Sequence, residues 1–189
     1  MRFDDIFACQ RHYPIDRLVG AANLFDLLPD DTFTGSETVS SELLDARNRA
    51  RELFRNLPDS ADRNSVLGAL GRVGKLSLKK KVRSRSQVIV RLVGELFPDI
   101  DFVTDHAIEC RNFYIHGTKP KLDYGSGIRP ISFFTDTLEF VFVVSDLIEC
   151  GWSTGSSLRR LTSTSHPFGR YRATYNDDLA ALKALSTLS

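Results

Sequence analysis

The sequence predicts an all-α protein, a bundle of about five to seven helices. Apolar residues recur at helical spacing in several segments that are separated by Pro or Gly. No segment shows a strand-like alternation strong enough to indicate a sheet. With 189 residues and 42% hydrophobic content, the chain can bury a substantial core.

Seven segments carry the helical pattern. The first has Pro14 in its opening turn and repeats apolar residues until Pro29. Ser60 can cap a later helix, and Pro98 and Gly117 bound another, because Gly readily adopts the left-handed conformation that ends a helix. The expected helices cover residues 13–28, 42–56, 61–75, 77–97, 101–117, 131–150 and 178–188.

We expect one helical domain over residues 1–152, followed by a Ser/Thr-rich segment and last helix, residues 153–189, that pack on the same domain. The segment 153–169 is rich in Ser, Thr and Gly, which favour loops. The helix 131–150 carries more apolar residues than one side can hold. It is therefore expected at the centre of the core or in a dimer interface.

Charge and cysteine content narrow the function classes. A formal net charge of +1 gives no global attraction to nucleic acid. Cys9, Cys110 and Cys150 are far apart and form no CxxC pair, which argues against a zinc ribbon or a disulfide framework. This cysteine pattern and the lack of a recognisable signal peptide predict that the protein is cytoplasmic. The longest apolar run, residues 131–150, contains four acidic residues, so no membrane span is expected.

The helix 101–117 carries a narrow polar stripe. Asp105, Glu109, Asn112 and His116 follow i, i+4, i+7 and i+11, which places them within roughly 60° of one another. Apolar residues border the stripe on both sides. Because buried polar side chains need partners, the stripe should face a cleft, another polar helix or its own copy in a dimer.

Arg111 lies off this stripe, but its long side chain can reach round towards His116. The segment Arg111–His116, RNFYIH, matches an Arg, polar residue, three spacers and His. This pattern resembles the signature of the HEPN superfamily of all-helical ribonucleases and nucleotide-binding proteins, and ECRNFYIHG is similar to its ApeA-like branch. A second Arg-to-His spacing, Arg160 and His166, lacks the Asn and lies in a Ser/Thr-rich segment.

The resemblance implies a metal-independent endoribonuclease, with a HEPN-like bundle and no cofactor or metal. His116 would act as general base or acid, Arg111 would hold the scissile phosphate, and Asn112 would orient either group. Asp105, Glu109 and Tyr114 would be supporting residues. HEPN enzymes commonly pair two motifs across a homodimer, which would supply two histidines and leave a 2′,3′-cyclic phosphate.

The ApeA-like resemblance also implies a context, phage defence or a toxin system. A regulatory or antitoxin partner, or an additional N-terminal sensor domain, would then restrain the enzyme. The other function that stays open is a non-catalytic HEPN-type RNA-binding or assembly module, in which His116 would be dispensable.

A basic stretch gives a second expected contact with RNA. From Arg63 to Gly94 the chain has nine Lys or Arg residues and no acid. Such an excess suits a phosphate backbone, although a solvated helix face would look the same. The expected RNA-binding residues are Lys79, Lys80, Lys81, Arg83 and Arg85.

Three competing chemistries fit less well. Asp105, Glu109 and His116 could ligate a metal, but no HExxH pattern or second nearby His completes that site. The glycines before Lys75 have the wrong spacing for a phosphate-binding loop, and Leu76 stands where Ser or Thr is needed. Cys110 falls on the buried side of its helix, which disfavours a nucleophilic cysteine.

Overall fold

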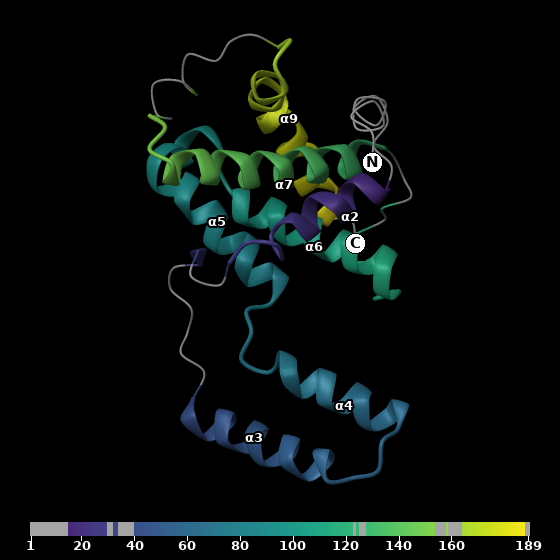
Figure 1. Cartoon of the computed structure of the whole chain (residues 1–189). Helices are drawn as coiled ribbons and strands as arrows, with labels where there is room; N and C mark the ends of the chain where they lie inside the picture. Colours follow the sequence, from purple (N-terminus) through teal and green to yellow (C-terminus); the bar gives the residue numbers. More distant parts are fainter. Residues whose placement is uncertain are drawn as a thin grey trace, which may run out of the picture. The chain divides into compact units, whose positions relative to one another are not determined.

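The computed structural model describes residues 15–29, 32–33, 40–122, 124, 128–153, 158 and 164–187. Within these residues all regular structure is helical and no strand occurs, which confirms the all-α prediction (Figure 1). The α-helices are α2 (Ile15–Leu24), α3 (Ser41–Arg55), α4 (Ala61–Arg72), α5 (Leu78–Val93), α6 (Ile100–His116), α7 (Ile128–Glu149) and α9 (Pro167–Thr187). A short 3₁₀ helix, η2 (Gly94–Leu96), follows α5.

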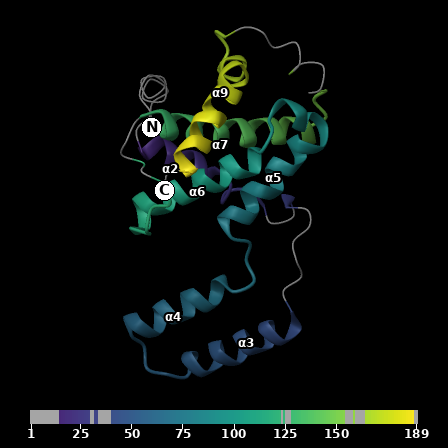
Figure 2. The same cartoon turned by 180° about the vertical axis from the view of Figure 1, so that it is seen from behind.

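The chain forms two compact units. Residues 1–34 and 78–189 make one unit, called the bundle below, and residues 35–77 make the other, the α3–α4 hairpin. The same two groups of helices can be followed from behind in Figure 2. The sequence did not indicate this insertion of one unit into the other, because the hairpin helices look as amphipathic as the rest.

Helix α7 is the centre of the bundle, as its composition predicts. It contacts α2, α5, α6 and α9. Aromatic and branched residues on several sides of it are buried, among them Phe133, Phe134, Leu138, Phe140 and Val144. A helix that is apolar all round has to be covered all round, and four helices cover this one.

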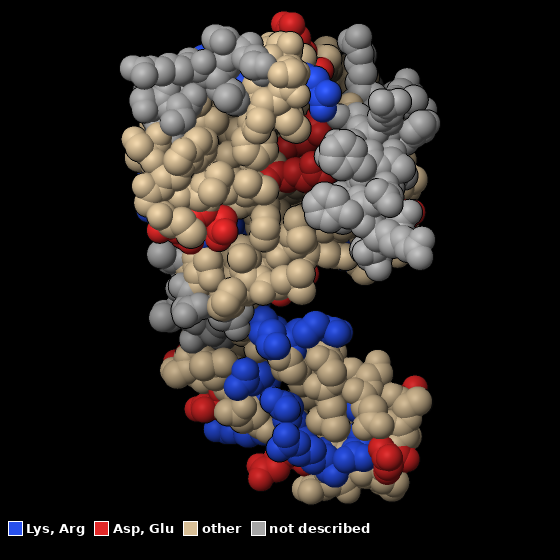
Figure 3. All heavy atoms as spheres, turned by 45° about the horizontal axis from the view of Figure 1, so that its top comes forward, with Lys and Arg blue, Asp and Glu red and all other residues tan. Residues whose placement is uncertain are grey.

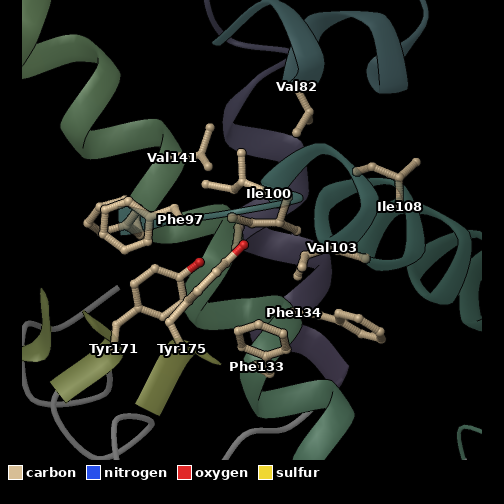
Figure 4. Packing of buried hydrophobic residues seen from close by; sticks show 14 of the residues in the cluster. Val82, Phe97, Ile100, Val103, Ile108, Phe133, Phe134, Val141, Tyr171 and Tyr175 are labelled. Atoms are coloured by element: carbon tan, nitrogen blue, oxygen red, sulfur yellow. The ribbon is translucent and has the colours of Figure 1, made fainter. Parts of the chain in front are cut away.

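The last helix is longer than predicted. Instead of beginning near residue 178, α9 begins at Pro167, where the Phe168 amide donates to His166 Nδ1 over 3.2 Å. Tyr171 and Tyr175 fix this extra length, since their rings contact the Phe97 ring with centroids 5.8 and 5.2 Å apart. Figure 4 shows these rings gathered in the core. The Tyr175 hydroxyl also donates to the Pro98 carbonyl over 2.7 Å.

The α3–α4 hairpin is held by caps and backbone contacts rather than by a core. Ser40 and Ser60 accept bonds from the amides of Leu43 and Arg63, which begins each helix. The cap predicted at Ser60 is thus confirmed. The Arg63 side chain donates to the carbonyls of residues 54 and 55. In the described part of the hairpin, neither helix has a buried residue.

The C-terminal end of α2 also differs from expectation. Helix α2 stops at Leu24 and a turn follows, in which the Phe25 amide bonds the Ala22 carbonyl over 3.3 Å. The expected opening at residues 13–14 lies outside the described residues.

No helix in the described parts of the chain is both long and apolar enough to cross a membrane.

Candidate active site

The ends of α6 place the candidate site. Asp99 precedes the helix with a left-handed backbone, φ 54°, and its carboxylate accepts a bond from Lys183 over 2.6 Å instead of capping the helix. Gly117 ends the helix with φ 63°, as predicted, and its amide bonds the Phe113 carbonyl over 3.0 Å. His116 is therefore the last helical residue, and it is exposed.

One face of α6 enters the core and the polar stripe lies away from it. Val103, Ala107 and Cys110 are fully buried. Burial raises the pKa of the Cys110 thiol to about 12, so the thiolate needed for nucleophilic attack is scarce at neutral pH. Tyr114 is half-buried, with its ring edge-on to the Phe113 ring at 4.9 Å.

The N-terminal half of the polar stripe forms a cluster of ion pairs and hydrogen bonds between α6 and α5, called the clasp below. Asp105 accepts bonds from Arg83, and Lys79 Nζ lies 3.0 Å from its carboxylate. Glu109 is 3.4 Å from Lys79 Nζ and 2.6 Å from Lys121 Nζ. One turn earlier, Gln87 donates to Asp101 over 2.6 Å and Ser86 donates to the same carboxylate. These acids hold two helices together.

The charges of the clasp fix the protonation of Asp105. Burial alone would raise the pKa of Asp105, but the hydrogen bonds from Arg83 and Lys79, with their charges, lower it overall. The same contact raises the pKa of Arg83, and the bond to Glu109 raises the pKa of Lys121. Asp105 is therefore an ionised structural acid rather than a proton donor at neutral pH.

The C-terminal half of the stripe meets Arg111. Arg111 Nη1 lies 3.0 Å from His116 Nε2 and donates to Asn112 Oδ1, also over 3.0 Å. The reach of Arg111 towards His116 that the sequence predicts is present. A guanidinium group can only donate, so in this contact His116 Nε2 is the acceptor, which requires the tautomer with the ring proton on Nδ1.

A fourth residue, Asn23 of α2, completes this cluster. Its Oδ1 accepts a bond from Arg111 Nη2 over 3.0 Å, and it is exposed like His116. Sequence reasoning missed Asn23, because its helix is otherwise a core-facing segment and the contact spans 88 residues. The available signal was a lone amide near the end of an apolar helix.

The charge of Arg111 is not neutralised. In the described residues its partners are two amide oxygens and an imidazole, and no carboxylate contacts it. By contrast, Arg17 is bound to Glu139 over 2.6 Å, and Arg83 to Asp105. A guanidinium fork that is positioned but unpaired is suited to bind a phosphate oxygen pair.

The predicted RNA-binding face on α5 needs correction. Arg85 is fully buried, with its guanidinium 2.6 Å from Glu149 and 2.9 Å from the Ser145 hydroxyl. Lys81 is only 8% exposed and lies 3.1 Å from Asp26. Neither can meet a phosphate, and Lys79 and Arg83 are engaged in the clasp. Of the five, Lys80 and Arg83 are exposed, and Arg83 is bound to Asp105.

The carboxylates of the stripe are also unsuited to a metal. Among the described residues, no group of three or more His, Cys, Asp or Glu side chains is placed to hold an ion. Asp105 and Glu109 face Lys and Arg instead, and His116 faces Arg111.

The fold and this cluster define a class, the helical-bundle proteins with an arginine–histidine site at the end of one helix. A comparison with protein families identifies the family, because residues 19–156 match the model of the Apea-like HEPN family. The match covers most of the chain, so the protein belongs to this family. HEPN domains are often ribonucleases, and membership indicates an RNA-related or defence module. Comparisons with curated proteins and with solved structures gave no match.

Proposed function

We propose that the protein is a metal-independent endoribonuclease whose site is Arg111, Asn112 and His116. The observation that carries the proposal is the contact between Arg111 and His116 Nε2, 3.0 Å long, in a guanidinium without a carboxylate partner. It joins an anion-binding cation to an unprotonated imidazole nitrogen. RNA cleavage through the 2′-hydroxyl needs these two groups side by side.

The first half of the reaction follows from the donor pattern. A phosphate that binds Arg111 competes with His116 for the guanidinium and frees Nε2. His116 then takes the proton of the 2′-hydroxyl, the 2′ oxygen forms a bond to phosphorus, and Arg111 stabilises the negative charge that develops on the phosphoryl oxygens. Asn112 and Asn23 keep the guanidinium oriented through the bonds described above.

The second half needs an acid. As the bond from phosphorus to the 5′ oxygen breaks, that oxygen requires a proton, and His116 of the same chain is holding the one it has just taken. A second copy of the chain would supply a protonated His116. The site lies at an exposed helix end, and Ile115 beside it is 47% exposed, which leaves room for a homodimer. The products are a 2′,3′-cyclic phosphate and a 5′-hydroxyl.

The test is cleavage of a mixed RNA pool in EDTA by the wild type and by His116→Ala, each checked for helicity and for oligomeric state. We expect the wild type to leave cyclic phosphate ends and the variant to lose the activity. Arg111→Lys keeps the charge but loses the fork, so it should cleave slowly. Cleavage that survives in His116→Ala would refute the assignment.

A second candidate is a non-catalytic RNA-binding or assembly module. The observation that favours it is the same contact, since His116 Nε2 is already occupied by Arg111 in the resting protein. This candidate predicts RNA binding without cleavage, and unchanged binding in His116→Ala. For either candidate, phage defence or a toxin system restrained by a partner is the context that we propose.

A further inference from the structure

The basic residues of α5 and those of the α3–α4 hairpin differ in their partners. On α5, Lys79, Lys81, Arg83 and Arg85 all contact carboxylates of α6, α7 or the turn after α2. Their charges are neutralised within the bundle. If the protein holds RNA, most of the attraction must come from elsewhere, because phosphate neutralisation supplies the sequence-independent affinity.

The hairpin carries more basic than acidic side chains. Its described residues, 40–77, include seven basic and five acidic side chains. Arg63 is paired with Asp59 over 2.9 Å, and Arg47 donates to the neutral oxygens of Asn48 and Val73. Across these described residues, no carboxylate partner occurs for Arg47, Arg49, Arg51, Arg55, Arg72 or Lys75.

Three of these arginines form a line along α3, called the arginine stripe in this subsection. Arg47, Arg51 and Arg55 are spaced i, i+4, i+8, so successive residues are about 6 Å apart along the helix. The acids of the same helix, Glu42, Asp45 and Glu52, lie roughly 100° to 180° away from the line. Arg51 Nε is shielded from solvent and has no hydrogen-bond partner among the described groups. Figure 3 shows basic side chains gathered on this unit.

An apolar pocket adjoins the end of this arginine stripe. It measures about 360 Å³ and is lined mainly by Phe54, Leu57, Pro58 and Val66, with Arg63 and Asp62 among its polar neighbours. Phe54 directly precedes Arg55 in α3. Single-stranded RNA is commonly held by cations on its backbone and by apolar or aromatic side chains under its unstacked bases. The hairpin offers both kinds of group together.

We propose that Arg47, Arg51 and Arg55 of α3 form a surface that binds single-stranded RNA. This inference rests on the proposed function for RNA as the ligand, but not for cleavage. The arginines contact phosphates, and the pocket beside Arg55 takes a base.

The test uses the full chain with His116→Ala, so that binding is measured without cleavage. The stripe variant carries Arg51→Gln and Arg55→Gln, and the matched control carries Arg49→Gln and Arg72→Gln, which removes the same charge from other faces of the hairpin. The dissociation constant of a labelled single-stranded RNA is measured by anisotropy over a range of salt. A duplex of the same length is the second ligand.

We expect the stripe variant to bind at least about tenfold more weakly, with the slope of log K against log salt reduced by about 1.4, since each single-strand phosphate contact contributes about 0.7. The control should lose less than about threefold, and Arg51→Lys with Arg55→Lys should retain most of the affinity. Equal losses in stripe and control variants, or none in the stripe variant, overturn the proposal. Equal affinity for the duplex overturns the single-strand assignment.

Failure of this inference is distinguishable from failure of the proposed function. A wild type that binds RNA through the stripe but never cleaves it refutes the nuclease and leaves the binding surface intact. With an active wild type, the stripe variant should raise KM for a single-stranded RNA and leave kcat unchanged at saturation. A lowered kcat with unchanged KM would overturn the stripe as a binding surface.

Discussion

Arg85 and Arg111 are the same residue type on neighbouring helices, yet their surroundings assign them opposite uses. Arg85 is buried and contacts Glu149 and Asp146 of α7, with the Ser145 hydroxyl as a further partner. Arg111 contacts only Asn23, Asn112 and His116 in the described structure. Pairing with carboxylates turns an arginine into part of the architecture, whereas neutral partners position the fork and leave its charge for a ligand.

The same difference separates the two basic segments of the chain. Lys79, Lys81, Arg83 and Arg85 of α5 are paired with acids of the bundle, whereas the α3 arginines have no carboxylate partner among the described residues. A count of positive charges along the sequence ranks α5 first. A count of unpaired charges ranks α3 first, and the second count is the one that an RNA backbone responds to.

The largest effect should follow from Arg111→Ala. Removing the group that stabilises the charge on the phosphoryl oxygens is expected to lower the single-turnover cleavage rate about 10³-fold. Because Arg111 neutralises no buried carboxylate, the free energy of unfolding should change by less than about 1 kcal/mol. Cleavage and urea unfolding measured on the same preparation check both halves. A variant that keeps more than a tenth of the rate would show that Arg111 is not in the site.

Arg85→Ala should do the reverse. It removes a buried cation and leaves two carboxylates without their partner, so we expect a loss of about 3 kcal/mol in the free energy of unfolding. The cleavage rate of the folded fraction should stay unchanged. The control is Arg85→Met, which keeps most of the buried volume and should lose less. If Arg85→Ala changed stability by under about 1 kcal/mol, the contrast between paired and unpaired arginines would fail.

Substitutions of Asn23 can change Arg111 from an arginine with neutral partners into one paired with a carboxylate, as Arg85 is. Asn23→Ala removes one acceptor that orients Arg111, and kcat/KM should fall about tenfold. Asn23→Asp keeps the shape but gives Arg111 a carboxylate partner, so the fork should turn towards it and activity should fall further, to about a hundredth of wild type. RNA cleavage by the two variants, with thermal unfolding as control, is the measurement. Equal activity of Asn23→Asp and wild type would contradict this reasoning.

Features that depend on neighbours in sequence could be predicted. The bounds of α6, with Gly117 at its end, follow from local backbone preferences, and the contact of Arg111 with His116 lies within one helix. The composition of α7 predicted either the centre of the core or a dimer interface, and its contacts with α2, α5, α6 and α9 place it at the centre. The start of α9 was within reach as well, because Phe168, Tyr171, Tyr175, Leu179 and Leu182 keep the helical spacing that places them against the core.

Features that depend on tertiary partners could not be predicted. Asn23 meets Arg111 across 88 residues, and Arg85 meets Ser145 across 60. The polar stripe of α6 was read correctly as a line that needs partners. Lys79 and Arg83 of α5 pair with the N-terminal half of the stripe and leave its C-terminal half to Arg111. The sequence pattern of α6 alone does not show which of its residues face α5.

The smallest effect we expect concerns His106, which sits against the clasp. Its ring is edge-on to Phe102 at 4.5 Å, and Glu109, Asp105, Lys79 and Lys121 are the charged groups around it. Burial lowers its pKa below the ordinary value of 6.5, although Glu109 opposes this shift. The unfolded chain therefore takes up the proton first. Stability should be complete above about pH 6.5 and fall as the pH drops towards the folded pKa.

Replacement of His106 by a group that does not titrate should flatten this slope. The measurement is the urea midpoint of unfolding between pH 7.5 and 5. His106→Gln and His106→Phe differ in packing, so a loss of the pH dependence of stability in both variants would identify protonation of His106 as its cause. Asp105→Asn is separable, because the pKa of Asp105 is also lowered but from 3.8, and its contribution is lost only in more acid solution. A wild type whose stability is level from pH 7.5 to 5 would mean that His106 stays solvated.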